Sequence, residues 1–125
     1  MLNKKLKILA VDDDMINLKL LKSMLTKQDN ISEVLEARNG ADAIEILKST
    51  EDIDIILLDI IMPVMGGLEM LKILRADDNL KQLPVIMLTT DETKKSEALE
   101  CGANGFLMKP IRAHDLTEQI ARLSI

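Results

Sequence analysis

Residues 53–59 read IDIILLD, an apolar run that is nearly continuous and ends on the carboxylate of Asp59. A strand with one face in water alternates apolar and polar residues, whereas a strand covered on both faces is apolar almost throughout. Residues 53–58 are therefore predicted to form the central strand of a sheet that has helices on both faces. Asp59 is predicted to stand at the carboxyl end of that strand.

Further strands and helices alternate along the chain. Apolar runs like the first predict four more strands, at residues 8–11, 34–37, 85–88 and 106–108, the second being weak and placed at an edge. Apolar residues at helical spacing form one face of each predicted helix: Leu18, Leu21 and Leu25; Ala43, Ile44 and Leu47; Leu71 and Leu74; and Leu116, Ile120 and Leu123. Residues 93–101 are also predicted to be helical, with a thin apolar face of Ala98 and Leu99. The five alternations predict an α/β fold with a parallel sheet, in which residues 1–125 form a single domain.

The composition excludes several classes of function. The 125 residues carry 16 basic and 21 acidic side chains, so the chain lacks the basic excess that nonspecific DNA binding requires. Phe106 is the only aromatic residue, which leaves no stacking platform for single-stranded nucleic acid. No apolar run approaches the length of a membrane span, and the first residues lack the apolar core of a signal peptide. We therefore expect a cytoplasmic domain with no membrane partner and no direct nucleic-acid binding.

Polar residues follow the predicted strands at their carboxyl ends, where open parallel sheets place their ligands. The strands run into residues 12–14, which are three aspartates, into Asp59, into Thr89 and Thr90, and into Lys109 followed by Pro110. These positions are far apart along the chain. The pattern predicts that one edge of the sheet gathers several carboxylates, a hydroxyl and an ammonium group.

The charges of this set predict a hard divalent cation. Asp12, Asp13 and Asp59 carry three negative charges when all are ionised, and Lys109 supplies one positive charge. All the candidate ligands are oxygens, which favours Mg²⁺, with Mn²⁺ able to substitute. We predict Asp13 as a direct ligand and Asp12 as a ligand either directly or through water. Asp59 and the main-chain carbonyl of Ile61 are predicted to complete the set of ligands that the protein supplies to the ion.

A carboxylate held beside Mg²⁺ and an ammonium group can attack a phosphoryl group and form an acyl phosphate. Asp59 is predicted to be this nucleophile, because it stands alone at the end of the central strand. Lys109 and the ion would stabilise charge on the transferred oxygens, and the hydroxyl of Thr89 can hydrogen-bond one of them.

Four stretches of the chain resemble the receiver domains of response regulators, the phosphoacceptor half of two-component signalling. They are residues 8–14 (ILAVDDD), 57–67 (LLDIIMPVMGG), 84–90 (PVIMLTT) and 102–110 (GANGFLMKP). The resemblance covers essentially the whole chain. It implies a doubly wound, flavodoxin-like (βα)5 fold with strand order 2-1-3-4-5. It also implies a histidine kinase or histidine phosphotransfer protein as phosphodonor, and an unidentified output protein or domain as target.

The resemblance assigns roles to individual residues. In this sequence the family's acidic pair, phosphoacceptor, hydroxyl residue and lysine fall on Asp12 and Asp13, Asp59, Thr89 and Lys109. Phe106 holds the position of the aromatic switch, and the bond from Lys109 to Pro110 is expected to be cis. Thr89 and Phe106 are expected to move together on phosphorylation. The fourth helix, fifth strand and fifth helix would then present a different face to a partner.

Some positions depart from the family pattern. Gly66 stands where the family commonly has Asp or Asn, which removes a cap from the third helix and loosens the loop before it. Phe106 replaces the Tyr of many members and lacks its hydroxyl. Ile61 and Asp91, two residues past Asp59 and Thr89, should flank the path of a hydrolytic water. Ile61 cannot orient water and Asp91 is short, so we predict a long-lived phosphoryl group.

Two competing functions are disfavoured. A Mg²⁺-dependent phosphohydrolase usually needs a second acid two residues after its nucleophile, and Ile61 stands there. We therefore expect no enzyme acting on external substrates, but an acceptor whose phosphotransfer and autodephosphorylation are limited to itself. A phosphate-independent scaffold would be expected to lose part of the acidic, hydroxyl and lysine set, which is intact here. Asp14 is interpreted as a helix cap, and His114 as a surface residue.

Overall fold

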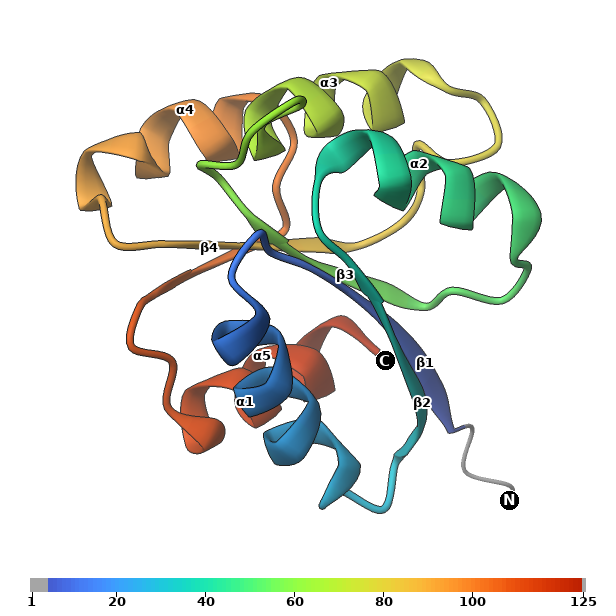
Figure 1. Ribbon diagram of the computed structural model, residues 1–125, viewed down its shortest axis with the longest axis vertical. Helices are drawn as coiled ribbons and strands as arrows, with labels where there is room; N and C mark the ends of the chain where they lie inside the picture. The colour runs from blue at the N-terminus through green and yellow to red at the C-terminus, as the bar shows by residue number, and fades with distance from the viewer. Residues whose placement is uncertain (1–4, 125) are drawn as a thin grey trace.

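Parallel strands form the middle layer of the computed structural model, which describes residues 5–124 (Figure 1). The strands are β1 (Leu6–Val11), β2 (Ile31–Ala37), β3 (Ile55–Asp59), β4 (Val85–Thr89) and β5 (Gly105–Met108). They pair in the order β2-β1-β3-β4-β5, and every pair is parallel. The predicted doubly wound, flavodoxin-like topology is confirmed. The edge strand is longer than predicted, and Ile53 is buried but precedes β3.

Helices cover both faces of the sheet. They are α1 (Met15–Thr26), α2 (Gly40–Ser49), α3 (Gly67–Ala76), α4 (Lys95–Glu100) and α5 (Ala113–Leu123). Figure 1 shows α1 and α5 on one face and α2, α3 and α4 on the other. Within the described part of the chain, no helix combines the length and the apolar character needed to cross a bilayer.

The inner strands divide their side chains between two cores, because successive residues of a strand point to opposite faces. On β3, Ile56 and Leu58 pack into the core under α2, α3 and α4, while Ile55 and Leu57 pack into the core under α1 and α5. All four are at most 1% exposed. Each such burial contributes on the order of 1.5–3 kcal/mol. This two-sided burial explains why the run in the sequence is nearly continuous.

The helix starts follow local capping chemistry. The side chain of Asp14 accepts a hydrogen bond of 2.9 Å from the N–H of Ile16, which confirms Asp14 as the cap of α1. Gly66 precedes α3 and gives it no side-chain cap, as predicted. The predicted helix at residues 93–101 is a short 3₁₀ turn, η1 (Glu92–Lys94), followed by α4.

The packing of α4 is thinner than predicted. Ala98 is its only buried residue, and Leu99, which we placed on the apolar face, is 46% exposed. The prediction for Leu99 is wrong because a helix of six residues has room for less than two turns and turns one narrow face to the sheet. A single buried side chain, that of Ala98, therefore anchors the body of α4 in the core.

Candidate functional site

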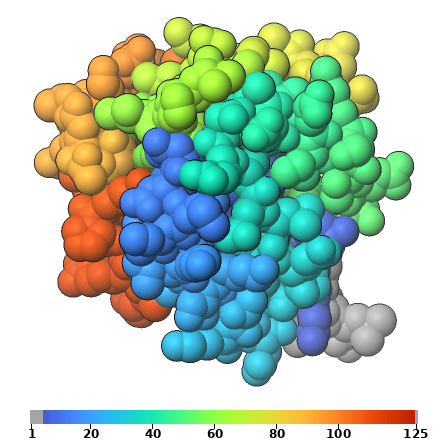
Figure 2. Space-filling view, in the orientation of Figure 1, coloured from blue at the N-terminus to red at the C-terminus, as the bar shows by residue number. Residues whose placement is uncertain are grey.

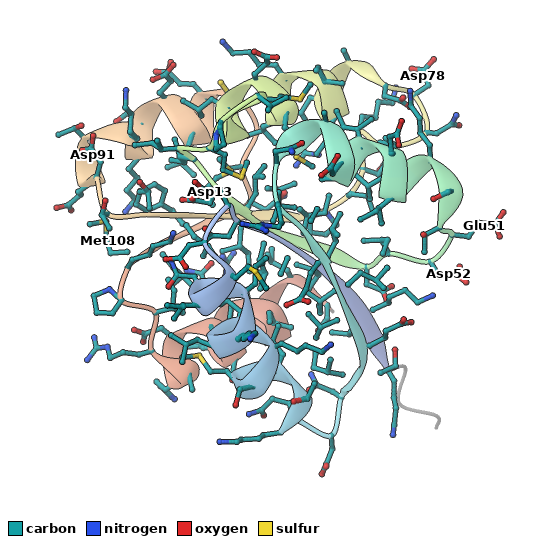
Figure 3. All side chains as sticks on the ribbon, viewed as in Figure 1. Asp13, Glu51, Asp52, Asp78, Asp91 and Met108 are labelled. Atoms are coloured by element: carbon teal, nitrogen blue, oxygen red, sulfur yellow. The ribbon has the colours of Figure 1, made fainter. Side chains whose placement is uncertain are left out.

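The sheet brings the predicted residues to one edge. Asp12 follows β1, Asp59 and Thr89 end β3 and β4, and Lys109 follows β5. The register places Asp59 opposite Leu88, and Thr89 opposite Met108, the residue before Lys109. In Figure 3, Asp13, Asp91 and Met108 lie at this end of the molecule, while Glu51, Asp52 and Asp78 lie at the opposite end. The predicted convergence of the strand ends is confirmed.

Lys109 joins two of the carboxylates. Its Nζ lies 2.8 Å from Oδ2 of Asp12 and 3.3 Å from Oδ1 of Asp59. Asp12 is fully buried, and its other oxygen accepts a hydrogen bond of 2.9 Å from the N–H of Asp14. Both oxygens of Asp12 therefore have partners inside the protein, so its charge is compensated although it is out of water.

Three carboxylates form a compact oxygen cluster. Asp12, Asp13 and Asp59 each offer one oxygen, and these oxygens lie within 4.8 Å of one another. Asp13 is exposed whereas the other two are buried, so the cluster is open to solvent on the Asp13 side. Three carboxylates and one ammonium group leave two negative charges uncompensated. Oxygen ligands, this charge and access to water fit a hard divalent cation such as Mg²⁺ that keeps part of its water shell.

The pKa of Asp59 is raised from 3.8 to about 6. Burial is the largest cause, and the negative charge of Asp12 adds to it, while the nearby ammonium group of Lys109 offsets part of both. Burial works against the charge of Lys109 as well, but the hydrogen bond and charge of Asp12, together with Asp59, outweigh it and raise the pKa of Lys109. The lysine is therefore cationic at neutral pH. The ionised form of Asp59 is disfavoured by burial and by Asp12, so an additional cation nearby would stabilise it.

The loop after Asp59 folds back over the end of β3. The N–H of Gly67 donates to the carbonyl of Ile60 at 2.8 Å, and a Cβ on Gly67 would lie only 2.1 Å from the carbonyl oxygen of Asp59. Glycine is therefore required at this position by close approach. Figure 2 shows this loop (lime green) against the start of α2 (teal), where the N–H of Gly40 donates to the carbonyl of Met65 at 3.1 Å.

Ile61 and Val64 project from this loop. Ile61, two residues past Asp59, is 63% exposed. Its carbonyl, the predicted metal ligand, accepts no backbone hydrogen bond within residues 5–124. Val64 is 83% exposed and has a φ of +69°, a conformation that β-branched residues rarely adopt. Nothing in the sequence pattern indicated this strained turn.

Thr89 and Asp91 connect the site to η1 and α4. Thr89 is buried, and its Oγ1 accepts a hydrogen bond of 3.1 Å from the N–H of Asp91. The carboxylate of Asp91 accepts hydrogen bonds from the N–H and the hydroxyl of Thr93, which caps η1 and lowers the pKa of Asp91. Asp91 was predicted to flank a hydrolytic water. The structure shows that one of its oxygens is already engaged in capping.

The remaining predicted residues lie where expected. Phe106 on β5 is half-buried against the core under α2, α3 and α4. The bond from Lys109 to Pro110 is cis, which confirms the prediction. His114 lies on α5, where its Nε2 is 3.3 Å from a carboxylate oxygen of Glu118, and both side chains are largely exposed. His114 takes no part in the acidic cluster, as predicted.

Comparisons with known proteins agree with this geometry. The family model described as "Response regulator receiver domain" matches residues 8–121. The chain is 37% identical to chemotaxis protein CheY-3 of Vibrio cholerae. The alignment spans 124 residues, which are 98% of this chain and 94% of that protein. It also resembles many solved structures, of which two are described next.

The first structure is Vibrio cholerae chemotaxis protein CheY4, with a TM-score of 0.86 and 33% identity over 95% of this chain and 98% of that one. The second is the CheX–CheY–BeF3–Mg²⁺ complex of Borrelia burgdorferi, with a TM-score of 0.86 and 27% identity over 98% and 91% of the two chains. The family is one of signalling phosphoacceptors that bind Mg²⁺ through an acidic pocket. The chain belongs to the response regulator receiver domain family.

Proposed function

We propose that residues 1–125 form one receiver domain that accepts a phosphoryl group on Asp59 and thereby changes its binding to a partner. The observation that carries the proposal is the contact of Lys109 with both Asp12 and Asp59 at the edge of the sheet, beside the exposed Asp13. This arrangement pairs a buried nucleophile with one fixed positive charge and an opening to water. A CheY relative of the same fold has been solved with BeF3 and Mg²⁺, which supports the assignment.

Each residue has a defined part in the proposed transfer. A carboxylate oxygen of Asp59 attacks phosphorus, the bond from phosphorus to the donor's imidazole nitrogen breaks, and the electron pair stays on that nitrogen. Lys109 Nζ, 3.3 Å from Asp59, balances charge on the arriving oxygens. Asp13 and Asp59, the carbonyl of Ile61, and Asp12 directly or through water, would hold Mg²⁺. When bound, Mg²⁺ keeps Asp59 ionised and neutralises the phosphoryl oxygens.

The proposed lifetime of the phosphoryl group is long. Ile61 is exposed but offers no polar atom on its side chain to orient a hydrolytic water. One oxygen of Asp91 is engaged with Thr93. Autodephosphorylation is thus slow, and the domain is a signalling acceptor and not an enzyme for external substrates.

The proposed signal starts at Thr89. Phosphorylation replaces a single carboxylate charge with nearly two charges and three strong acceptors. When the Thr89 hydroxyl turns to donate to one of them, it weakens its hydrogen bond with the N–H of Asp91, the residue that caps η1. Phe106 turns into the space that Thr89 leaves. The surface of α4, β5 and α5 then shifts between two packings of one fold.

The partners in this proposal are protein ones. The donor is a histidine kinase or a histidine phosphotransfer protein in the cytoplasm, and the target is an output protein or domain that recognises the shifted surface. CheX is the partner in the Borrelia burgdorferi complex, which supports partner binding by this fold. Direct binding to nucleic acid or to a membrane has no part in the proposal.

The proposal is tested by intact mass after incubation with Mg²⁺ and acetyl phosphate. We expect one added phosphoryl group on the wild type, loss of the adduct when Mg²⁺ is removed by chelation, and no adduct on Asp59→Asn. Asp78→Asn is the matched control, because Asp78 is exposed at the opposite end of the molecule (Figure 3). An adduct on Asp59→Asn equal to that of the wild type, or none on the wild type, would contradict the proposal.

A further inference from the structure

The two ends of α4 are held by different means. Its N-terminal end continues from η1, whose cap Asp91 donates its N–H to the Thr89 hydroxyl, so this end depends on the site itself. Its C-terminal end runs into Gly102, whose carbonyl accepts hydrogen bonds from Nε and Nη2 of Arg75 at 3.1 and 2.9 Å. Arg75 lies on α3, which takes no part in the acidic cluster.

The guanidinium of Arg75 joins several segments. Besides the two bonds to Gly102, its Nη1 donates to the carbonyls of Lys81 and Leu83 at 3.1 and 2.9 Å, and its Nη2 donates to Oδ1 of Asn104 at 2.9 Å. These five bonds match the five N–H donors that a guanidinium carries. Partial burial lowers the pKa of Arg75, and the acceptor oxygens replace hydrogen bonds that the guanidinium would otherwise make to water. Lysine has three donors on one nitrogen and cannot span the same acceptors.

The acceptor segment is shaped around Arg75. Gly102 has a φ of +105°, and a Cβ there would lie 2.9 Å from Nε of Arg75 and 3.2 Å from its Cδ. Asn104 then fastens the segment to the sheet: its Oδ1 also accepts from the N–H of Val85 at 2.9 Å, and its own N–H donates to the carbonyl of Val85 at 2.8 Å. The C-terminal end of α4 is thus tied to α3 and to the first residue of β4.

The body of α4 adds little to hold its position. Ala98 is its only buried residue, so few apolar contacts oppose a rotation of the helix. A short helix with one tied end and one end that depends on Thr89 has one easy motion, in which its displacement grows with distance from the tied end. A shift of the whole helix would carry Gly102 and Asn104 with it and would break the three bonds that Arg75 donates to these two residues.

We propose that residues 102–104, clamped by Arg75, are a fixed hinge about which α4 pivots when Thr89 turns toward the site. The cause of the pivot rests on the proposed function, whereas the clamp does not. The surface that changes most is the one farthest from the hinge, formed by Asp91, η1 and the first residues of α4. Arg75 is therefore a positioning residue, which decides where the signal appears without touching the acidic cluster.

The hinge is tested by amide hydrogen exchange of the full chain with and without Mg²⁺ and beryllofluoride. In the wild type we expect exchange at residues 91–96 to change by about tenfold, the equivalent of ~1.4 kcal/mol, and exchange at residues 102–104 to change by less than about twofold. The amides of Gly102, Ala103 and Asn104 are suitable reporters because each donates a backbone hydrogen bond. Equal changes in the two segments would overturn the hinge.

Arg75→Met and Arg75→Lys test the clamp without any phosphoryl mimic. In both variants we expect faster exchange at residues 102–104 in the resting protein, and a response to beryllofluoride that spreads into this segment. Lys72→Met, which removes an exposed charge one turn earlier on the same helix, should behave as the wild type. The amides of β1 and β3 report whether a variant is globally destabilised, and residues 102–104 are judged relative to them.

The outcomes separate the hinge from the proposed function. A wild type that takes up no phosphoryl group and does not respond to beryllofluoride would overturn the proposed function and the pivot with it. Normal phosphoryl uptake in Arg75→Met, together with exchange at residues 102–104 equal to that of Lys72→Met, would overturn the clamp alone. Normal uptake with the loosened segment is the result that the proposal predicts.

Discussion

The helices α1 and α4 both begin just after strand ends that line the site, but they are attached to the sheet very differently. Over its 12 residues, α1 buries Leu18, Leu21 and Leu25 and has a side-chain cap in Asp14. Over six residues, α4 buries only Ala98 and has no side-chain cap of its own. Asp12 and Asp13 therefore precede a well-packed helix, whereas Thr89 precedes η1 and α4, which are held by fewer buried side chains. In the proposed function, metal binding involves the residues before α1, and the conformational change starts at Thr89, before η1 and α4.

The largest expected effect is the loss of stability when a leucine of α1 is shortened, compared with the same change in α4. Leu21→Ala should lower the free energy of unfolding by about 2–5 kcal/mol, because the leucine is 3% exposed and its removal leaves a cavity. Leu99→Ala should change it by no more than about 0.5 kcal/mol, because Leu99 is 46% exposed. Urea unfolding followed by circular dichroism measures both. Equal losses would mean that α4 is as firmly packed as α1.

A smaller effect, dependent on pH, is expected at Asp59 in metal-free protein. The pKa of Asp59 is raised from 3.8 to about 6 in the folded state, so between these values the folded protein binds more protons than the unfolded one, and stability falls as pH rises. The penalty becomes constant above about pH 7, where Asp59 is ionised in both states. Asp59→Asn should therefore be more stable than the wild type by about 1–3 kcal/mol at pH 7.5, and the difference should disappear near pH 4.

The control for this prediction is Asp78→Asn, which should show no such pH-dependent difference. Thermal or urea unfolding in chelator at a series of pH values gives the curve. A stability difference for Asp59→Asn that stays constant from pH 4 to 7.5 would contradict the raised pKa. Mg²⁺ should reduce the difference at pH 7.5, because it stabilises only the wild-type carboxylate cluster.

A change of about fivefold is expected for dephosphorylation of Ile61→Asn. The amide adds a donor and an acceptor that can orient water near the phosphoryl group, and one positioned hydrogen bond is worth about 1 kcal/mol. Loss of the acyl phosphate, followed by intact mass over time, should be faster than in the wild type. Ile61→Val keeps an apolar side chain and should decay at the wild-type rate. No acceleration in Ile61→Asn would remove Ile61 from the account of phosphoryl lifetime.

The smallest effect on the chemistry is expected for Phe106→Ala. Phe106 packs against the core under α2, α3 and α4. The rate of phosphoryl uptake from acetyl phosphate should change by less than about twofold, because the apolar ring of Phe106 supplies neither a charge nor a hydrogen bond to the transfer. The exchange response of residues 91–96 to beryllofluoride should fall. A variant that keeps the full response would show that Phe106 is a core residue and no switch.

Most of the site was predictable because its residues interrupt strong patterns. Asp59 and Thr89 end apolar runs, and parallel strands bring their carboxyl ends to one edge whatever lies between them. The contacts within the cluster, such as Lys109 Nζ at 2.8 Å from Asp12, then follow from charge. The family resemblance added the cis bond before Pro110, which no local pattern specifies.

The Arg75 clamp was not predictable in the same way. Its acceptors are mainly backbone carbonyls, at Lys81, Leu83 and Gly102, which every residue type carries. The close approach of the Arg75 side chain to Gly102 depends on how two segments far apart in the sequence are placed, which no local pattern specifies. The exposure of Leu99 was missed because helical spacing says which residues share a face but not how much of that face is covered.

The most direct test of the account is to locate the phosphoryl group in the chain. After phosphorylation with acetyl phosphate and Mg²⁺, borohydride reduces an acyl phosphate to an alcohol, and peptide mass spectrometry identifies the reduced residue. We expect that the reduced residue is Asp59, in the peptide that contains β3, and that Asp12 and Asp13 are unchanged. Reduction at Asp12 or Asp13, or spread over several exposed carboxylates, would contradict the assignment of Asp59 as the acceptor.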